Sequence, residues 1–124
     1  MASRRKKVLI VDDNQDAADS LAMLVKLKGH EAFVAYDAET GLEVAHKSTP
    51  DVILHDINLP HMSGYEAVHR LRRDKKLEST TFVALTAFAT TDDRKRALSE
   101  GFDLHMSKPV EFNELYRILD NVRV

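Results

Sequence analysis

The sequence has 124 residues, 44% of them apolar and 31% charged, a balance typical of one soluble globular domain rather than of a disordered or collagen-like chain. Eighteen basic and twenty acidic residues give a net charge of −2, so bulk charge does not indicate nucleic-acid binding. Cysteine is absent, which excludes disulfides and thiolate metal sites. We recognise neither a secretory signal nor a membrane span of ~18 apolar residues, and we therefore expect a cytoplasmic protein.

The first part of the sequence alternates short apolar runs with helical patterns. Val8–Val11 is a continuous apolar run, as in strands that are covered on both faces. It stops at Asp12-Asp13-Asn14, where a helical spacing of apolar residues begins and continues to Gly29, the expected C-terminal stop. Phe33–Tyr36 is predicted as the second strand, and Asp37 as the N-cap of the helix that follows it.

The middle of the sequence predicts a third strand and a third helix. The strand is expected over Val52–His55 and ends at Asp56. After a turn-rich loop, Ser63 and Glu66 have the spacing of a capping box, which predicts a helix from there to about Arg73.

Two further strand and helix units complete the sequence. Thr81–Leu85 is predicted as the fourth strand, ending at Thr86, and a polar surface helix is expected over about Asp92 to Glu100. The short fifth strand is predicted at Asp103–Met106, just before Lys108. The last helix carries its larger apolar residues on one face: Phe112, Leu115, Tyr116 and Leu119.

Strands that alternate with helices predict an α/β fold. We expect a doubly wound, five-stranded parallel sheet in the flavodoxin-like order 2-1-3-4-5, with right-handed crossovers and helices on both faces. No repeat or linker interrupts the pattern, so residues 1–124 are predicted to form a single domain with its core at about residues 7–122. Ligands of such sheets bind beyond the carboxyl ends of the strands, and this is where functional residues are expected.

The predicted strand ends carry three carboxylates, a hydroxyl and an amine. Asp12 and Asp13 follow the first strand, Asp56 the third, Thr86 the fourth and Lys108 the fifth. Neighbouring carboxylates repel one another unless a cation offsets their charge, and Mg²⁺ or Mn²⁺ prefers such oxygen ligands. Lys108 can pair with Asp56 or with a phosphoryl oxygen. The combination favours phosphoryl transfer to a carboxylate, with Asp56 as the nucleophile because it stands alone at its strand end.

Each of these residues also has an ordinary structural interpretation. Acidic pairs often start helices, a single aspartate can cap a turn, and an isolated lysine is usually solvated. Their joint occurrence at four of the five predicted strand ends favours the functional interpretation.

With these residues the sequence strongly resembles the receiver domains of two-component response regulators. Four stretches carry the resemblance, which covers about Lys7 to Val122: residues 8–14, 51–65, 85–87 and 108–109. The amino-acid sequence of three segments is most similar to that of receivers joined to hybrid histidine kinases: residues 16–21, 64–66 and 101–103.

The resemblance implies a phosphoacceptor and a metal site. Asp56 would accept the phosphoryl group from a phosphohistidine on a histidine kinase or histidine phosphotransfer protein. Asp13 and Asp56 would bind Mg²⁺ through their side chains, Asn58 through its backbone carbonyl, and Asp12 through a metal-bound water.

The resemblance also implies a switch. Thr86 would follow the phosphoryl group and Lys108 would pair with it, with a cis bond before Pro109. Many receivers have an inward-turning Tyr or Phe three residues before the lysine, where this sequence has His105, so the aromatic form of the switch is left open. His55, beside the acceptor, is interpreted as a hydrogen-bonded strand histidine.

The expected function is a two-state switch in which the surface of helix four, strand five and helix five changes its affinity for an unknown output protein or domain. Because this sequence ends at Val124, the output is expected to be another protein or another part of a longer chain. The chain is not expected to turn over an external substrate. The short basic clusters at residues 4–7 and 94–96 are interpreted as solvated, so nucleic acid and membranes are not expected as direct partners.

Two alternatives remain open. One is an aspartate-nucleophile phosphatase of the haloacid dehalogenase type, which has a second aspartate two residues after its nucleophile, where this sequence has Asn58. The other is a receiver that binds partners without ever being phosphorylated.

Overall fold

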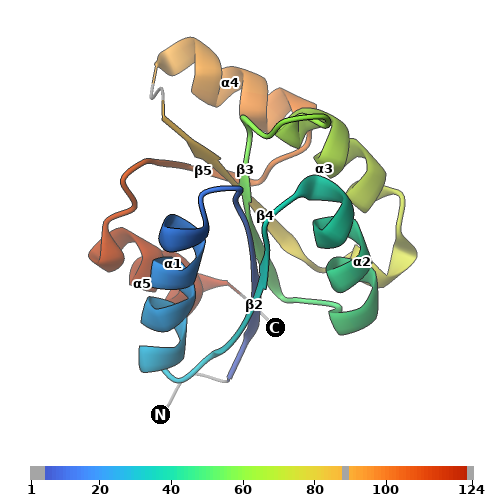
Figure 1. Cartoon of the computed structure of the whole chain (residues 1–124). Coiled ribbons are helices and arrows are strands. Elements are labelled where there is room, and N and C mark those ends of the chain that lie inside the picture. The colour runs from blue at the N-terminus through green and yellow to red at the C-terminus, as the bar shows by residue number, and fades with distance from the viewer. Residues whose placement is uncertain (1–4, 88–89, 123–124) are drawn as a thin grey trace.

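The computed structural model describes residues 5–87 and 90–122, and within them five parallel strands form one sheet in the order β2-β1-β3-β4-β5 (Figure 1). The strands are β1 (Lys7–Val11), β2 (Glu31–Ala35), β3 (Val52–Asp56), β4 (Thr81–Thr86) and β5 (Leu104–Ser107). The predicted fold class and strand order are confirmed. Arg4, the first residue of the predicted basic cluster, lies outside the described residues.

The helices cover both faces of the sheet (Figure 1). α1 (Gln15–Leu27) and α5 (Phe112–Asn121) lie on one face, and α2 (Ala38–Ser48), α3 (Gly64–Arg72) and α4 (Thr91–Glu100) lie on the other. A short 3-10 helix, η1 (Lys75–Leu77), follows α3 and was not predicted. None of the helices within the described ranges is both long and apolar enough to cross a membrane.

The core consists of two apolar layers, one on each side of the sheet. Successive strand side chains point to opposite faces, so Ile10 and Leu54 pack toward α1 and α5, whereas Leu9 and Ile53 pack toward α2 and α3. All four are fully buried, and each such burial contributes about 1.5–3 kcal/mol relative to an exposed side chain. Burial on both faces explains why the central strands are continuous apolar runs.

Helix boundaries follow the predicted caps. Asp37 accepts a hydrogen bond from the Thr40 N–H at 2.7 Å, and the Ser63 hydroxyl accepts one from the Glu66 N–H at 3.2 Å. Gly29, two residues beyond α1, has a φ of 92°, in the left-handed region that glycine adopts without strain. The predicted helix starts and this helix stop are therefore confirmed.

Several predicted boundaries differ from the structure. The second strand spans Glu31–Ala35, and Tyr36 lies beyond it, where its hydroxyl donates to Asp19 at 2.6 Å. The fifth strand begins at Leu104 and continues to Ser107. Phe112, predicted on the apolar face of the last helix, is 52% exposed and contacts Tyr116 edge-on instead of entering the core.

Candidate functional site

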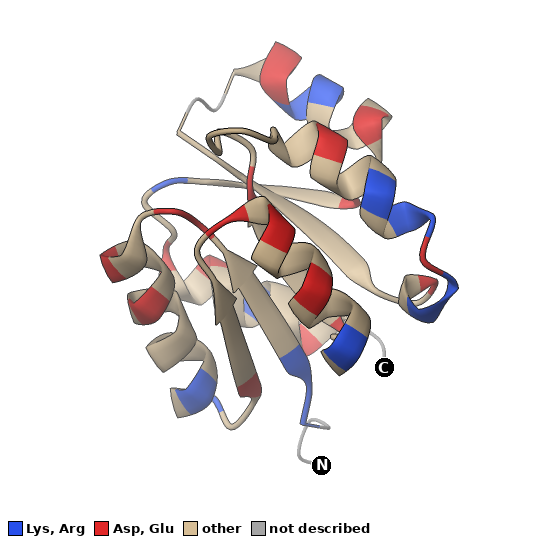
Figure 2. Ribbon diagram, turned by 45° about the vertical axis from the view of Figure 1, so that its right-hand side comes forward, with Lys and Arg blue, Asp and Glu red and all other residues tan. Residues whose placement is uncertain are grey.

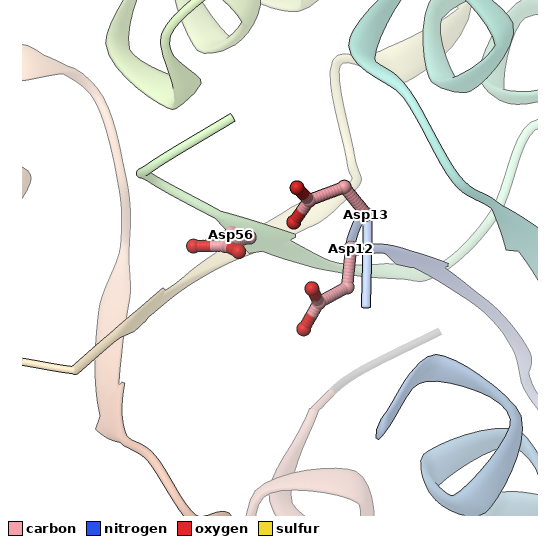
Figure 3. A group of neighbouring side chains, drawn as sticks. All are labelled: Asp12, Asp13 and Asp56. Carbon is pink, nitrogen blue, oxygen red and sulfur yellow. The ribbon is translucent and has the colours of Figure 1, made fainter. Parts of the chain in front are cut away.

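The three predicted carboxylates meet at the carboxyl edge of the sheet. β1 and β3 are neighbours, with Val11 in register with His55, so the residues at the ends of these strands arrive at one place. Asp12, Asp13 and Asp56 each offer an oxygen, and these atoms lie within 4.8 Å of one another (Figure 3). The side chains of Asp12 and Asp56 are buried and that of Asp13 is exposed, so one side of the cluster is open to solvent.

Lys108 is the cation of this cluster. Its Nζ lies 2.9 Å from Asp56 Oδ2, as predicted, and 2.8 Å from Asp12 Oδ2, a contact that was not predicted. The backbone N–H of Lys108 donates to the Thr86 carbonyl at 2.8 Å, and the bond to Pro109 is cis, as the resemblance implied. The end of β4 therefore positions the lysine opposite the carboxylates.

Burial and pairing oppose each other in the ionisation of this cluster. Burial raises the pKa of Asp56 above its ordinary value, and hydrogen bonds from Lys108 and from the Asn58 N–H only partly offset this. Burial by itself would lower the pKa of Lys108, but hydrogen bonds to Asp12 and Asp56 outweigh it and the net shift is upward. The lysine is thus firmly charged, whereas ionisation of Asp56 remains costly even beside it.

The loop after β3 holds Asp56 in place. The Asn58 N–H donates to Asp56 Oδ1 at 3.0 Å, and the Gly64 N–H donates to the Ile57 carbonyl at 2.8 Å. A Cβ added to Gly64 would lie 2.6 Å from Ile57 Cα and 2.7 Å from the Asp56 carbonyl oxygen, so only glycine fits here. Sequence reasoning missed this role, although a glycine at the first position of a helix, directly after its cap, was a signal.

The two predicted switch residues lie on β4 and β5. Thr86 is buried at the end of β4, in register with Ser107. His105 pairs with Ala84 and is half-buried, and neither ring nitrogen has a hydrogen-bond partner among residues 5–87 and 90–122. Burial, reinforced by Arg94, lowers the pKa of His105, so its ring is neutral near pH 7. Movement of either side chain remains a prediction.

His55 is the hydrogen-bonded strand histidine that was predicted. Its ring is buried, with Nδ1 2.8 Å from the carbonyl oxygen of Asp56. Burial lowers its pKa to about 4, so the neutral ring donates its Nδ1–H to that carbonyl. His55 therefore stabilises the backbone at Asp56.

The donor set fits a hard divalent cation. Carboxylate oxygens are the ligands that Mg²⁺ takes, together with waters that the open side beside Asp13 can admit. A second positive charge would also offset the repulsion that Lys108 alone leaves among three carboxylates. Coordination by the Asn58 carbonyl remains a prediction.

Comparison with known proteins gives consistent matches. Residues 8–120 match the response regulator receiver domain family. The polar-differentiation response regulator DivK of Brucella ovis is 34% identical over 105 residues, which cover 85% of this chain and 85% of that protein. The hybrid signal transduction histidine kinase D of Dictyostelium discoideum is 33% identical over 117 residues, but these are 88% of this chain and only 8% of that kinase.

A solved structure with the same fold is described with a bound metal ion. It is the receiver domain of the sensor histidine kinase PA1611 from Pseudomonas aeruginosa PAO1, described with a magnesium ion coordinated in its active site cleft. It is 28% identical to this chain, with a TM-score of 0.86, and the match covers 96% of this chain and 98% of that one.

Proposed function

This chain belongs to the response regulator receiver domain family of two-component signalling, and from that premise we propose that it is a switch operated by phosphorylation of Asp56. One observation carries the proposal. The buried Asp56 carboxylate lies 2.9 Å from the Lys108 ammonium and shares a 4.8 Å cluster with Asp12 and Asp13. An aspartate in such a place can act as a nucleophile while Lys108, together with a cation held by the carboxylates, offsets the negative charge of the transferred group.

Mg²⁺ or Mn²⁺ would be held by Asp13 and Asp56, with Asp12 acting through a bound water and Asn58 through its carbonyl. When bound, the ion supplies positive charge that lowers the cost of bringing an anionic phosphoryl group to a carboxylate. The magnesium described for the PA1611 receiver supports this assignment.

The chemical step is a displacement at phosphorus. A carboxylate oxygen of Asp56 forms the new O–P bond as the P–N bond of a phosphohistidine breaks, and the leaving imidazole keeps the electron pair. Asp56 Oδ1 accepts the Asn58 N–H and Oδ2 accepts from Lys108, so the attacking carboxylate is already oriented. Lys108 then pairs with the phosphoryl oxygens, and the Thr86 hydroxyl donates to them. The phosphoryl group stays on the protein until water hydrolyses it, so no external substrate is turned over.

The donor would be a histidine kinase or a histidine phosphotransfer protein in the cytoplasm. The hybrid histidine kinase among the relatives supports this class of donor. The output would use the surface of α4, β5 and α5, whose exposed apolar side chains suit a protein or domain partner: Leu98, Leu104 and Phe112.

Intact mass after incubation with acetyl phosphate tests the proposal. We expect the wild type to gain one phosphoryl group only with Mg²⁺ present and Asp56→Asn to gain none. Asp92→Asn, the same change on the exposed surface of α4, serves as the matched control and should be modified like the wild type. Modification of Asp56→Asn, or of the wild type without any divalent cation, would contradict the assignment.

A further inference from the structure

A buried lysine and a buried histidine connect several elements at the edge of the sheet where the strands begin. Figure 2 shows basic residues near the N-terminus at the start of β1, and acidic residues in the loops beyond the opposite ends of the strands. Lys6 directly precedes β1 and is only 3% exposed. Its Nζ donates to the carbonyl of Leu119 in the last turn of α5. A helix leaves its last carbonyls without partners, so Lys6 caps the end of α5.

The backbone of Lys6 is held from the turn between α1 and β2. Its carbonyl accepts the N–H of Glu31 at 2.9 Å, and its N–H lies 3.0 Å from Nδ1 of His30. A backbone N–H can only donate, so Nδ1 accepts this hydrogen bond and carries no proton. The neutral His30 ring thus has its proton on Nε2, which is buried and has no hydrogen-bond partner within residues 5–87 and 90–122. His30 is 5% exposed, and the contact with Lys6 therefore fixes its protonation state.

A second proton on the His30 ring is incompatible with this contact. It would be carried by Nδ1, and the ring N–H and the Lys6 N–H would then be two donors that face each other. The ring or the chain at Lys6 would have to move, and the Lys6 N–H would lose its acceptor, which is costly in a buried place. The cationic ring would also lie beside the buried Lys6 ammonium.

Four charged groups face the His30 ring from the elements packed around it. Lys6 and Lys28 are cations that disfavour a charged ring, whereas Asp120 on α5 and Asp51 before β3 are carboxylates that favour it. Both carboxylates are already engaged, because Asp120 lies 3.9 Å from Lys28 Nζ and Asp51 accepts a backbone N–H at the start of β1 at 2.8 Å. Burial and the Lys6 charge outweigh them, so the pKa of His30 is lowered from its ordinary value.

We propose that His30 and Lys6 form an acid-sensitive lock on the end of α5. Near neutral pH the neutral His30 ring holds the backbone of Lys6 where its Nζ reaches the carbonyl of Leu119. When the ring becomes charged it releases the Lys6 N–H and repels the Lys6 ammonium, and the end of α5 loses its cap. Because the pKa of His30 is lowered in the closed state, the lock is complete above the open-state pKa of about 6.5 and weakens as the pH falls below it.

Other contacts confine the release to the last turn of α5. The Tyr116 hydroxyl donates to the Leu24 carbonyl at 3.2 Å, and Lys28 Nζ lies 5.1 Å from the centre of the Tyr116 ring. Neither contact involves His30 or Lys6, so the middle of α5 stays attached to α1. Since α5 is part of the output surface proposed above, acid would act on that surface without phosphorylation. This consequence rests on the proposed function, whereas the lock does not, because its residues lie outside the carboxylate and lysine cluster.

Amide hydrogen exchange of the whole unphosphorylated chain, followed by NMR at about pH 7.5 and about pH 5.5, tests the lock. After correction for intrinsic exchange rates, protection of the last turn of α5 should fall by up to about tenfold at the lower pH, which is about one unit below the open-state pKa. Protection of β3 should fall less. The Lys6 amide resonance should titrate together with the His30 ring.

Two variants and a control separate this lock from a general effect of acid. His30→Asn keeps an acceptor oxygen for the Lys6 N–H but does not titrate, so protection of α5 relative to β3 should be independent of pH. Lys6→Met retains the backbone contact but removes the cap, so its last turn of α5 should already exchange faster at pH 7.5 and change little with acid. His46→Asn, the same substitution at an exposed histidine of α2, should behave like the wild type.

Three results would overturn the proposal. One is an equal acid-induced loss of protection in α5 and β3 of the wild type, which would show that acid weakens the whole domain. Another is a Lys6 amide resonance that does not follow the His30 titration. The third is a Lys6→Met or a folded His30→Asn variant whose last turn of α5 loosens with acid as much as that of the wild type.

Discussion

Removal of the Lys108 charge should destabilise the protein, and Mg²⁺ should reverse the loss. In Lys108→Met the aliphatic stem is retained, but Asp12 and Asp56 lose contacts of 2.8 and 2.9 Å. Breaking a fully buried ion pair by removing one partner costs roughly 3–5 kcal/mol. The lysine side chain is 25% exposed, so water replaces part of the interaction, and we expect the free energy of unfolding to fall by about 2 kcal/mol at neutral pH.

Urea denaturation in EDTA measures this loss, and the melting temperature should fall by about 6–12 °C for a domain of this size. The difference from the wild type should shrink as the pH falls through the raised pKa of Asp56, because the protonated carboxyl no longer needs a cation. Saturating Mg²⁺ should stabilise the variant more than the wild type, because the ion replaces the missing charge. Lys47→Met on α2 is the control.

A Lys108→Met variant as stable as the wild type in EDTA at neutral pH would refute the reasoning. It would mean that the cluster does not depend on the lysine for charge balance. Equal stabilisation of both proteins by Mg²⁺ would show that the ion and the lysine do not act on the same carboxylates.

Three further predictions follow from the same contacts. Gly64→Ala should lower the free energy of unfolding by about 2–3 kcal/mol in urea denaturation, because backbone atoms of Ile57 block its Cβ, whereas Gly41→Ala, which meets only a side chain, should cost less. Asp56→Asn should be more stable than the wild type at pH 7 but not at about pH 3. Because the pKa of Asp56 is raised in the folded protein, the protonated carboxyl favours folding below the unfolded pKa, and this stability is lost as the pH rises through the folded pKa. A pH series of melting curves with a constant difference between the two proteins would contradict this. Arg72→Lys should cost about 1–2 kcal/mol in urea denaturation, because Arg72 donates two hydrogen bonds, of 2.7 and 3.0 Å, to the carbonyl of Gly101 just beyond α4. An unchanged midpoint would show that this contact does not stabilise the packing of α4 on α3.

The fold could be predicted because its determinants are local. Continuous apolar runs such as Val8–Val11 mark strands that are covered on both faces, and caps such as Asp37 and Ser63 mark where helices begin. Alternation of the two patterns then leaves a parallel sheet with few possible strand orders. Boundaries were less accurate where local signals were weak, as at Tyr36, whose aromatic ring suits a strand but whose hydroxyl contacts α1.

The sequence also predicted which side chains meet at the carboxyl edge of the sheet. Parallel strands place their carboxyl ends along one edge, so residues at strand ends can be brought together without knowledge of distances. This was sufficient to place Asp12, Asp13 and Asp56 in one cluster and Lys108 beside it. The departure at His105 was likewise visible in the sequence, although its burial and neutral charge were not.

The tertiary structure alone decided how the charges are shared. Lys108 contacts Asp12 as well as Asp56, Gly64 approaches the backbone of Asp56 and Ile57 too closely for any side chain, and Met23 is left exposed on a helix whose pattern looked ordinary. Each of these depends on the distance between elements that are remote in sequence. Periodicity and capping report how a segment meets its own neighbours, whereas burial, pairing and pKa depend on what the rest of the chain places beside it.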